Sequence, residues 1–325
     1  MNWDRLSDKK GQLDAFRPFP LELVSNLDQW FAVELTYTSN ALEGNTLTRR
    51  ETALVVEKGI TAGGKNLKEY IEAKAHAEAL KWLRLEAASS HFEVSEGTIL
   101  ELHRRILYLT DPDYAGRYRT VPVRISGSRV VLPNPIKVPD KMTAFVSELQ
   151  KSKRHPVQLA ADAHYDLVTI HPFVDGNGRT ARLLMTLILI LHGYPPAIIR
   201  KTDRLAYLSA LETAQLGGSK EPYFKLIFAA VDRSLSLYLN ALKGKGESAP
   251  EPSEGLLKIG ELAKHTNQTV STIRYWTHEG LLQMASTLPS GYALYSEDMI
   301  KQCTAIANLK KKGLSLKQIR KKLEA

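Results

Sequence analysis

The sequence predicts a mostly α-helical protein of two domains, with a short β-hairpin among the helices of the first domain. Apolar residues recur at helical spacing over most of residues 1–243. Residues 244–255 lack this periodicity and are rich in Gly, Pro and Ser, which is typical of a flexible linker. The length of 325 residues also fits two domains of roughly 100 to 200 residues each.

The composition is that of an ordinary globular protein, with 43% apolar and 24% charged residues. The most apolar stretch, Leu183–Leu191, is about half as long as a bilayer-spanning helix, so we expect no membrane partner. The N-terminus shows no apolar signal region, and the single cysteine, Cys303, cannot form an intrachain disulfide. We therefore expect a cytoplasmic protein.

Residues 1–60 form the first helical region. Apolar side chains recur at helical spacing from Leu23 to Leu35. The segment Thr48-Arg-Arg-Glu51 has the pattern of a capping box, and the helix that it opens is expected to stop before Gly59.

Residues 61–243 continue the helical pattern with one exception. The spacing of apolar residues predicts a helix over Tyr70–Leu83, and Ser95 is expected to cap the next one. Between Thr120 and Pro139, alternating apolar residues, a Ser-Gly-Ser turn and a second apolar run predict a short hairpin.

A loop that feeds a helix is expected after His171. An apolar helix from about Pro156 reaches His171, where Pro172 prevents its simple continuation. Two glycines permit a tight backbone path before a second apolar helix starts near Asn177. The start of such a helix presents unpaired N–H groups and the positive end of its dipole, which favours binding of an anion.

The side chains of this loop add chemistry suited to phosphates. Arg179 and Arg182 project from neighbouring positions of the new helix, His171 can accept a proton, and Asp175 can hold Mg²⁺ through oxygen. The chain has no Walker A pattern. Each residue taken singly has a structural explanation, but together they favour a phosphate site.

The stretch His171-Pro-Phe-Val-Asp-Gly-Asn-Gly-Arg-Thr-Ala-Arg182 resembles the signature of the Fic domain at every specified position. Fic proteins share an all-helical core, and most transfer AMP from ATP to a protein hydroxyl. Supporting similarity covers roughly residues 20–240. Tyr114–Arg119 and the hairpin after it resemble the region leading into the family's flap, which holds the target segment by strand addition.

The resemblance implies a role for each loop residue. His171 would be the general base, Asp175 the Mg²⁺ ligand, and Phe173 the anchor of the loop in the core. The phosphates of ATP would be held by Gly176, Asn177, Gly178, Arg179 and Arg182.

The segment Ser39-Asn-Ala-Leu-Glu43-Gly44 resembles the inhibitory motif that some Fic proteins carry N-terminal to their core. By that resemblance Glu43 would pair with Arg182 and deny it to the γ-phosphate, a competition that the strength of carboxylate–guanidinium pairs makes reasonable. The alternative is a solvated carboxylate beside a helix-capping glycine.

Two residues outside the motifs are less defined. Tyr207, on a helix from about Thr202, either flanks the adenine or packs in the core. His164 lies seven residues before His171, roughly on the same helical face, and is expected to be buried rather than to act as a base.

Residues 256–325 form a basic domain. They carry eleven Lys and Arg against five Asp and Glu, which is +6 of the chain's net charge of +9. Lys258–Thr266 is expected to form a short helix, Asn267-Gln268 a turn, and Thr269–Trp276 a second helix with Val270 and Ile273 inward. A wing and a long helix follow. This pattern resembles the winged helix-turn-helix DNA-binding domain of MerR-family regulators.

The resemblance to MerR regulators leaves two interpretations open. Ser271, Thr272 and Arg274 are candidate contacts to double-stranded DNA, but the wing, Ala285–Ser290, has none of the arginines that the family uses against phosphate. The family's dimerising helix is also missing, so a homodimer would have to form through the first domain. The alternative is a module that docks the protein target.

The sequence thus predicts a Fic-type helical core at 61–243, preceded by the region with the inhibitory motif. We expect a protein adenylyltransferase that uses Mg²⁺ and ATP, modifies a Ser, Thr or Tyr hydroxyl on a target or on itself, and is inhibited by Glu43. The alternative is a DNA-binding regulator whose Fic core senses nucleotide or modifies the regulator. A phosphotransferase of the Doc type is disfavoured because Gly176 and Gly178-Arg179 are kept.

Overall fold

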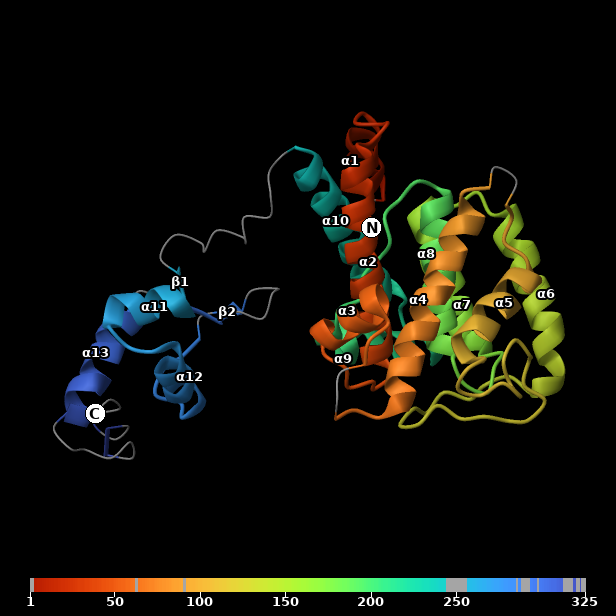
Figure 1. The fold of residues 1–325 in the computed structure, drawn as a ribbon. Coiled ribbons are helices and arrows are strands. Elements are labelled where there is room, and N and C mark those ends of the chain that lie inside the picture. The colour runs from red at the N-terminus through yellow and green to blue at the C-terminus, as the bar shows by residue number, and fades with distance from the viewer. Residues whose placement is uncertain are drawn as a thin grey trace. The chain divides into compact units, whose positions relative to one another are not determined.

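The chain divides into two compact units, Met1–Gly244 and Lys245–Ala325, each described by itself below (Figure 1). The computed structural model describes residues 3–61, 64–89, 92–243, 256–284, 286–287, 293–296, 298–311, 318–319 and 322. The predicted linker, residues 244–255, lies outside the described residues.

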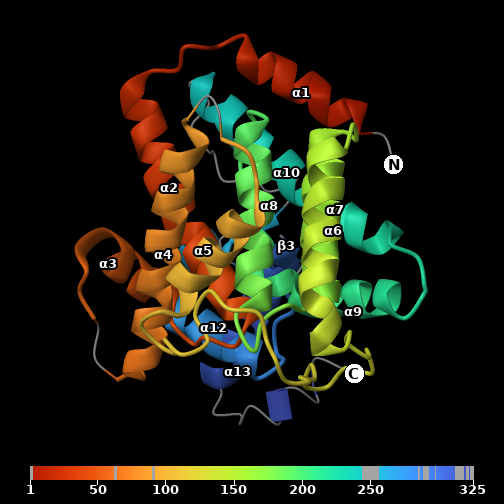
Figure 2. The same cartoon turned by 90° about the vertical axis from the view of Figure 1, so that its right-hand side faces the viewer.

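The first unit is a bundle of helices around one central helix, α8. The helices are α1 (Asp4–Asp14), α2 (Leu21–Leu42), α3 (Arg49–Lys58), α4 (Leu67–Ala87), α5 (Glu96–Leu107), α6 (Val138–Lys151), α7 (Pro156–Ile170), α8 (Asn177–Leu191), α9 (Arg204–Gln215) and α10 (Glu221–Leu242). Figure 2 shows α8 between α4 and α7, and it packs against α5 as well. Every residue from Arg179 to Leu189 is buried, as expected of a helix that is apolar nearly all round.

The local signals for helix ends are confirmed. Thr48 and Glu51 form the reciprocal capping box of α3, and Gly59 ends that helix in the left-handed conformation with φ 65°. Ser95 caps α5 by accepting a hydrogen bond from the Thr98 N–H. Short-range side-chain chemistry therefore fixes where these helices begin and end.

The prediction of a hairpin between Thr120 and Pro139 is wrong, because these residues form no strands. Residues 120–134, called the flap segment below, form an irregular loop with one turn, where the Ser128 N–H donates to Ile125 O at 3.1 Å. Val121 and Val131 are 50% and 92% exposed. Alternating apolar residues alone do not stabilise two strands, because an isolated hairpin needs a third strand or a helix to cover its apolar face.

The described part of the second unit contains a three-stranded antiparallel sheet and three helices. Its elements are β1 (Leu256–Lys258), α11 (Ile259–Thr266), α12 (Val270–His278), β2 (Ser286–Thr287), β3 (Ala293–Ser296) and α13 (Asp298–Lys311). The strand order is β1-β3-β2. Leu262, Ile273, Trp276, Cys303 and Ile306 belong to its core.

The helix-turn-helix geometry is present, with one correction. Asn267 takes the left-handed turn conformation at φ 51°, and Ile273 is buried as predicted. Val270 is 37% exposed rather than inward, because Thr269 caps α12 and leaves Val270 in its first turn. Most of the predicted wing and of the closing segment 313–320 lie outside the described residues.

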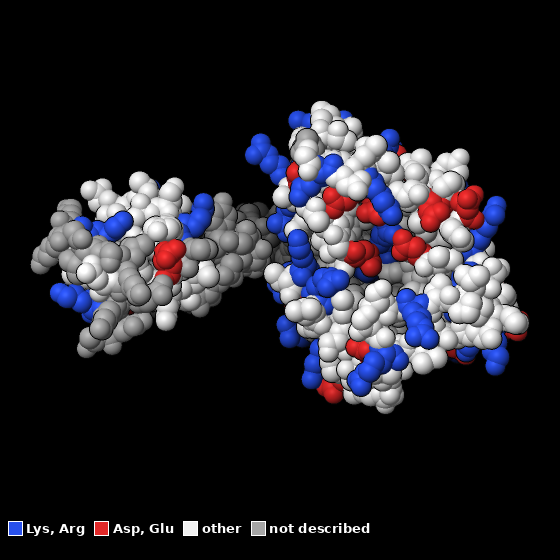
Figure 3. Space-filling model, turned by 90° about the horizontal axis from the view of Figure 1, so that it is seen from below, with Lys and Arg blue, Asp and Glu red and all other residues white. Residues whose placement is uncertain are grey.

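On the face shown in Figure 3, Lys and Arg of the first unit lie among Asp and Glu, so the unit presents no field of a single sign there. No helix in the described part of the chain is both long and apolar enough to cross a membrane.

Three histidines of the first unit are buried and held neutral. Burial, together with the smaller effect of the Arg182 charge, lowers the pKa of His76 and of His164 to about 3. Burial also lowers the pKa of His103 to about 4. Burial raises the pKa of Asp166 to about 6, so near pH 5 the folded state holds a proton on Asp166 that the unfolded state releases.

These groups predict that the first unit loses stability in mild acid. Unfolded histidines titrate near pH 6.5, so unfolding at pH 5 takes up about three protons while Asp166 releases one. These four groups alone give a net uptake of about two protons, and the lowered pKa values of His155 and His171 add to it, so the free energy of unfolding should fall between about pH 6.5 and pH 4.5. Urea midpoints measured across this range test the expectation, and His164→Gln should reduce the slope by about one proton. A flat profile would contradict it.

Candidate active site

The loop between α7 and α8 is closed by its own side chains. His171 ends α7 in the left-handed conformation, and its N–H donates to Leu167 O at 2.9 Å. The Asn177 side chain accepts from the Phe173 N–H at 3.0 Å and donates to Phe173 O at 2.9 Å. Phe173 is fully buried, as predicted. Asn177 therefore shapes the loop through both ends of its side-chain amide.

His103, on α5, packs against this loop, and no pattern in the sequence predicts this role. Its ring lies flat on Phe173, with centroids 3.6 Å apart. The Gly116 N–H donates to its Nδ1 at 3.0 Å, so its Nε2–H is the donor to Asp175 O at 2.9 Å. A Cβ on Gly176 would lie 2.9 Å from the Leu107 side chain and 3.3 Å from His103, which accounts for the glycine.

The imidazole of His171 has the tautomer that a base requires. Nδ1 lies 3.2 Å from Val168 O and can only donate to it, which leaves Nε2 as the acceptor. Burial lowers the pKa of His171, and the charge of Arg119 lowers it further, whereas Glu43 and Asp175 raise it. The ring is therefore neutral near pH 7 and able to take a proton.

The Glu43 carboxylate occupies the start of α8. Arg182 Nη2 donates to Glu43 Oε1 at 2.6 Å, and Arg182 also donates to Ser39 Oγ and Ser39 O, each at 3.0 Å. A Cβ on Gly178 would overlap Glu43 Oε1. The predicted pair therefore exists, and its carboxylate lies where the dipole of α8 favours an anion.

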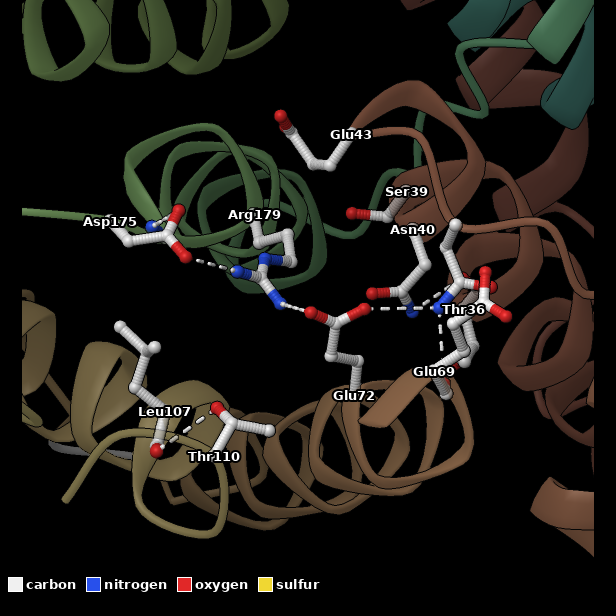
Figure 4. A network of polar contacts seen from close by, with 12 residues as sticks. Thr36, Ser39, Asn40, Glu43, Glu69, Glu72, Leu107, Thr110, Asp175 and Arg179 are labelled. Atoms are coloured by element: carbon white, nitrogen blue, oxygen red, sulfur yellow. Dashed lines mark hydrogen bonds and ion pairs between the residues drawn. The ribbon is translucent and has the colours of Figure 1, made fainter. Parts of the chain in front are cut away.

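Arg179 is held between two carboxylates (Figure 4). Its Nη2 lies 3.3 Å from Asp175 Oδ2, and its Nη1 lies 3.6 Å from Glu72 Oε1 on α4. Glu72 also accepts from Asn45 Nδ2 at 3.1 Å, which connects Arg179 to the turn that follows Glu43. No pattern near Glu72 in the sequence predicts its contact with Arg179.

Asp175 fits a cation that arrives with phosphates. Its side chain is 60% exposed, and Oδ1 accepts from the Gly176 N–H at 2.6 Å. No cluster of three or more His, Cys, Asp or Glu that could hold a metal occurs among the described residues. Mg²⁺ bound to a nucleotide needs only one or two protein carboxylates, because phosphates and water fill the other positions.

Of the two positions expected for Tyr207, the structure shows core packing, and a contact with adenine stays a prediction. Tyr207 is 2% exposed, and its hydroxyl lies 2.7 Å from His164 Nε2. The other ring nitrogen of His164 lies 2.9 Å from the Tyr223 hydroxyl. His164 is thus buried, as expected, in a hydrogen-bonded set that fixes Tyr207 away from solvent.

The candidate DNA contacts lie together at the start of α12 in the second unit. Ser271 and Arg274 are exposed, and Thr272 is half-buried. Thr269 accepts from the Thr272 N–H at 3.1 Å and so caps the helix.

The charges around His171 predict how its titration responds to substitution. Its pKa should lie below 6.5, and Glu43→Gln should lower it further because a nearby negative charge is removed. Glu72→Gln serves as the control, since Glu72 is not among the charges that shift His171. NMR titration of the ring protons measures all three values. A higher pKa in Glu43→Gln would refute the placement of this carboxylate.

Comparisons with known proteins agree with this geometry. The sequence model of the Fic/DOC family matches residues 93–189, and that of the MerR HTH family regulatory protein matches residues 257–325. Protein adenylyltransferase Fic of Nematostella vectensis is 36% identical over 239 residues, which cover 73% of this chain and 55% of the relative. Protein adenylyltransferase fic-1 of Caenorhabditis elegans is 36% identical over 69% of this chain and 46% of its own. The chain spans about half the length of these curated relatives.

Two solved structures share both fold and sequence with this chain. A Fic domain containing signaling protein from Bacteroides thetaiotaomicron has a TM-score of 0.68 and 34% identity, covering 75% of this chain and 98% of that one. Fic-1 from C. elegans has a TM-score of 0.68 and 32% identity, covering 75% of this chain and 72% of that one. The chain belongs to the Fic/DOC family.

Proposed function

We propose that this chain is a protein adenylyltransferase that moves AMP from ATP to a protein hydroxyl and is inhibited by Glu43. The observation that carries the proposal is the neutral His171, with Nε2 available, beside an anion site at the start of α8. The names of the curated relatives support the same activity. The single cysteine supports a cytoplasmic setting.

The chemistry follows from the positions of these groups. The acceptor hydroxyl gives its proton to His171 Nε2, and its oxygen forms a bond to the α-phosphorus of ATP. The bond from that phosphorus to the β-bridging oxygen breaks, and its electron pair leaves with pyrophosphate. Gly178 and Arg179 present N–H groups that have no acceptor within α8, and these hold phosphate oxygens. Asp175 would hold Mg²⁺, which neutralises phosphate charge.

Glu43 competes with the nucleotide for the same guanidinium. A buried Arg182 paired with a carboxylate at 2.6 Å is not available to the γ-phosphate. Without that contact the triphosphate is free to bind in other poses, and its α-phosphate loses the in-line geometry on which transfer depends. Glu43 therefore controls the reaction by controlling substrate position.

Removal of the Glu43 carboxylate should raise activity. We expect Glu43→Gly to increase the initial forward rate roughly tenfold to a hundredfold, because a correctly placed α-phosphate is worth rate factors of this order. The readout is mass spectrometry of the full chain after incubation with Mg²⁺ and ATP, searching for added AMP. Glu22→Gly, an exposed carboxylate at the other end of α2, is the matched control and should not change the rate.

Two further variants separate inhibition from general loosening of the site. His171→Ala should abolish transfer while the chain still binds ATP, because other groups hold the phosphates. The double variant Glu43→Gly with Arg182→Ala should be as slow as Arg182→Ala alone, since the guanidinium that Glu43 releases no longer exists. A forward rate in Glu43→Gly no higher than wild type would sink the inhibitory role.

A second function is favoured by the second unit. Its match to MerR regulators, its exposed Arg274 at the start of α12 and its charge of +6 support binding of double-stranded DNA. In that case the Fic core would sense nucleotide or modify the regulator itself, and a homodimer formed through the first unit would pair two recognition helices. The competing role is docking of the protein target.

DNA binding predicts a steep salt dependence. The full chain should bind duplex DNA with an affinity that falls as salt rises, whereas residues 1–243 alone should not bind. Arg274→Gln should lower the affinity and, if it contacts phosphate, reduce the slope of log affinity against log salt by about one. Fluorescence anisotropy at several salt concentrations measures both. Absence of binding by the full chain even at low salt would favour the docking role.

A further inference from the structure

Arg119 connects three segments of the first unit through one buried side chain. It precedes the flap segment and is 3% exposed. Its Nε donates to His171 O at 2.8 Å, Nη2 donates to Pro133 O at 2.6 Å, and Nη1 donates to Val121 O at 3.3 Å. Its own N–H donates to Pro172 O at 2.8 Å. The loop that carries the base and both ends of the flap segment are thus tied to a single residue.

Only the shape of a guanidinium accounts for this set of contacts. The described residues offer Arg119 carbonyl oxygens, and none of their carboxylates lies within ion-pair distance of it. Burying such a charge without a counter-ion costs several kcal/mol. The five N–H donors of arginine lie in a fixed plane and reach several acceptors at once, whereas a lysine presents one nitrogen. The Arg119 side chain therefore fixes the positions of its carbonyl partners, although its burial lowers the stability of the folded state.

The contact with His171 acts on a residue in an unusual conformation. His171 has φ 51°, a left-handed backbone that is strained for a non-glycine residue and persists only where the surroundings hold it. The Arg119 bond to His171 O fixes the orientation of the peptide that follows the imidazole. The same positive charge favours the neutral ring, together with burial and against Glu43 and Asp175.

The flap segment has a second anchor on α9. Glu212 Oε1 accepts from Ser128 Oγ and from the Arg129 N–H, each at 2.9 Å. The segment is thus held at its ends by Arg119 and near its middle by Glu212, and Val131 between these anchors is 92% exposed. The distance between His171 and any acceptor chain that lies along this segment therefore depends on Arg119.

We propose that Arg119 is a positioning residue that sets the register between the flap segment and the imidazole of His171, so that an acceptor hydroxyl on the flap meets Nε2. The proposal rests on the proposed AMP transfer. It predicts that loss of Arg119 impairs transfer without impairing nucleotide binding, because the phosphate-binding groups lie on α8 and its preceding loop and receive no hydrogen bond from the Arg119 side chain.

The test uses the full chain with Glu43→Gly, into which Arg119→Gln, Arg119→Lys and the control Arg117→Gln are introduced. Arg117 is exposed and lies two residues earlier, so the control makes the same change in charge. Arg119→Gln should slow single-turnover self-modification at saturating ATP by about tenfold or more, with unchanged ATP affinity by calorimetry. Amides of residues 121–133 should exchange hydrogen faster. Arg117→Gln should match its parent in every measurement.

Titration of His171 by NMR gives a readout that does not need activity. Arg119→Gln should raise the pKa of His171, whereas Arg119→Lys should leave it nearly unchanged because the charge remains, yet still loosen the flap. If the Glu43→Gly parent itself transfers no AMP, the proposed function fails, while exchange and titration still test Arg119. If Arg119→Gln keeps the rate, the exchange pattern and the titration of its parent, the proposal is overturned.

Discussion

The buried N-terminus of α8 is the constraint around which the first unit is built. A helix start leaves several N–H groups without acceptors and concentrates positive potential there, and here that end lies inside the bundle. The loop before it is therefore closed by Asn177 and supported by His103, and a carboxylate from α2 fills the anion position. The contacts of Asn177, His103 and Glu43 thus meet at this helix end and the loop before it.

The surrounding polar residues are kept neutral or paired for the same reason. Burial keeps the imidazoles of His76 and His164 uncharged, and the charge of Arg182 acts in the same direction. Among the described residues, Glu43 forms an ion pair with Arg182, and Glu72 and Asp175 form ion pairs with Arg179. The site thus combines two guanidiniums suited to phosphate with a neutral base suited to proton transfer.

The sequence was most informative where structure is decided locally. The capping boxes at Thr48 and Ser95 and the loop from His171 to Arg182 depend on residues a few positions apart. His103 and Arg119 were missed because their partners lie 72 and 52 residues away, and no local pattern marks such contacts. The sequence allows two positions for Tyr207, because helical spacing does not say which face a neighbouring helix covers. The hairpin failed because alternation is not sufficient without a packing partner.

The Glu43–Arg182 pair requires that position 178 carry no side chain. The volume that a Cβ would take at this position is already taken by the Glu43 carboxylate, and the Arg182 guanidinium lies next to it. Any side chain at position 178 would therefore disturb the pair, whereas a change at Glu43 leaves the backbone at Gly178 as it is. The Glu43–Arg182 pair can thus be removed by substitution at Glu43 without any change to the start of α8.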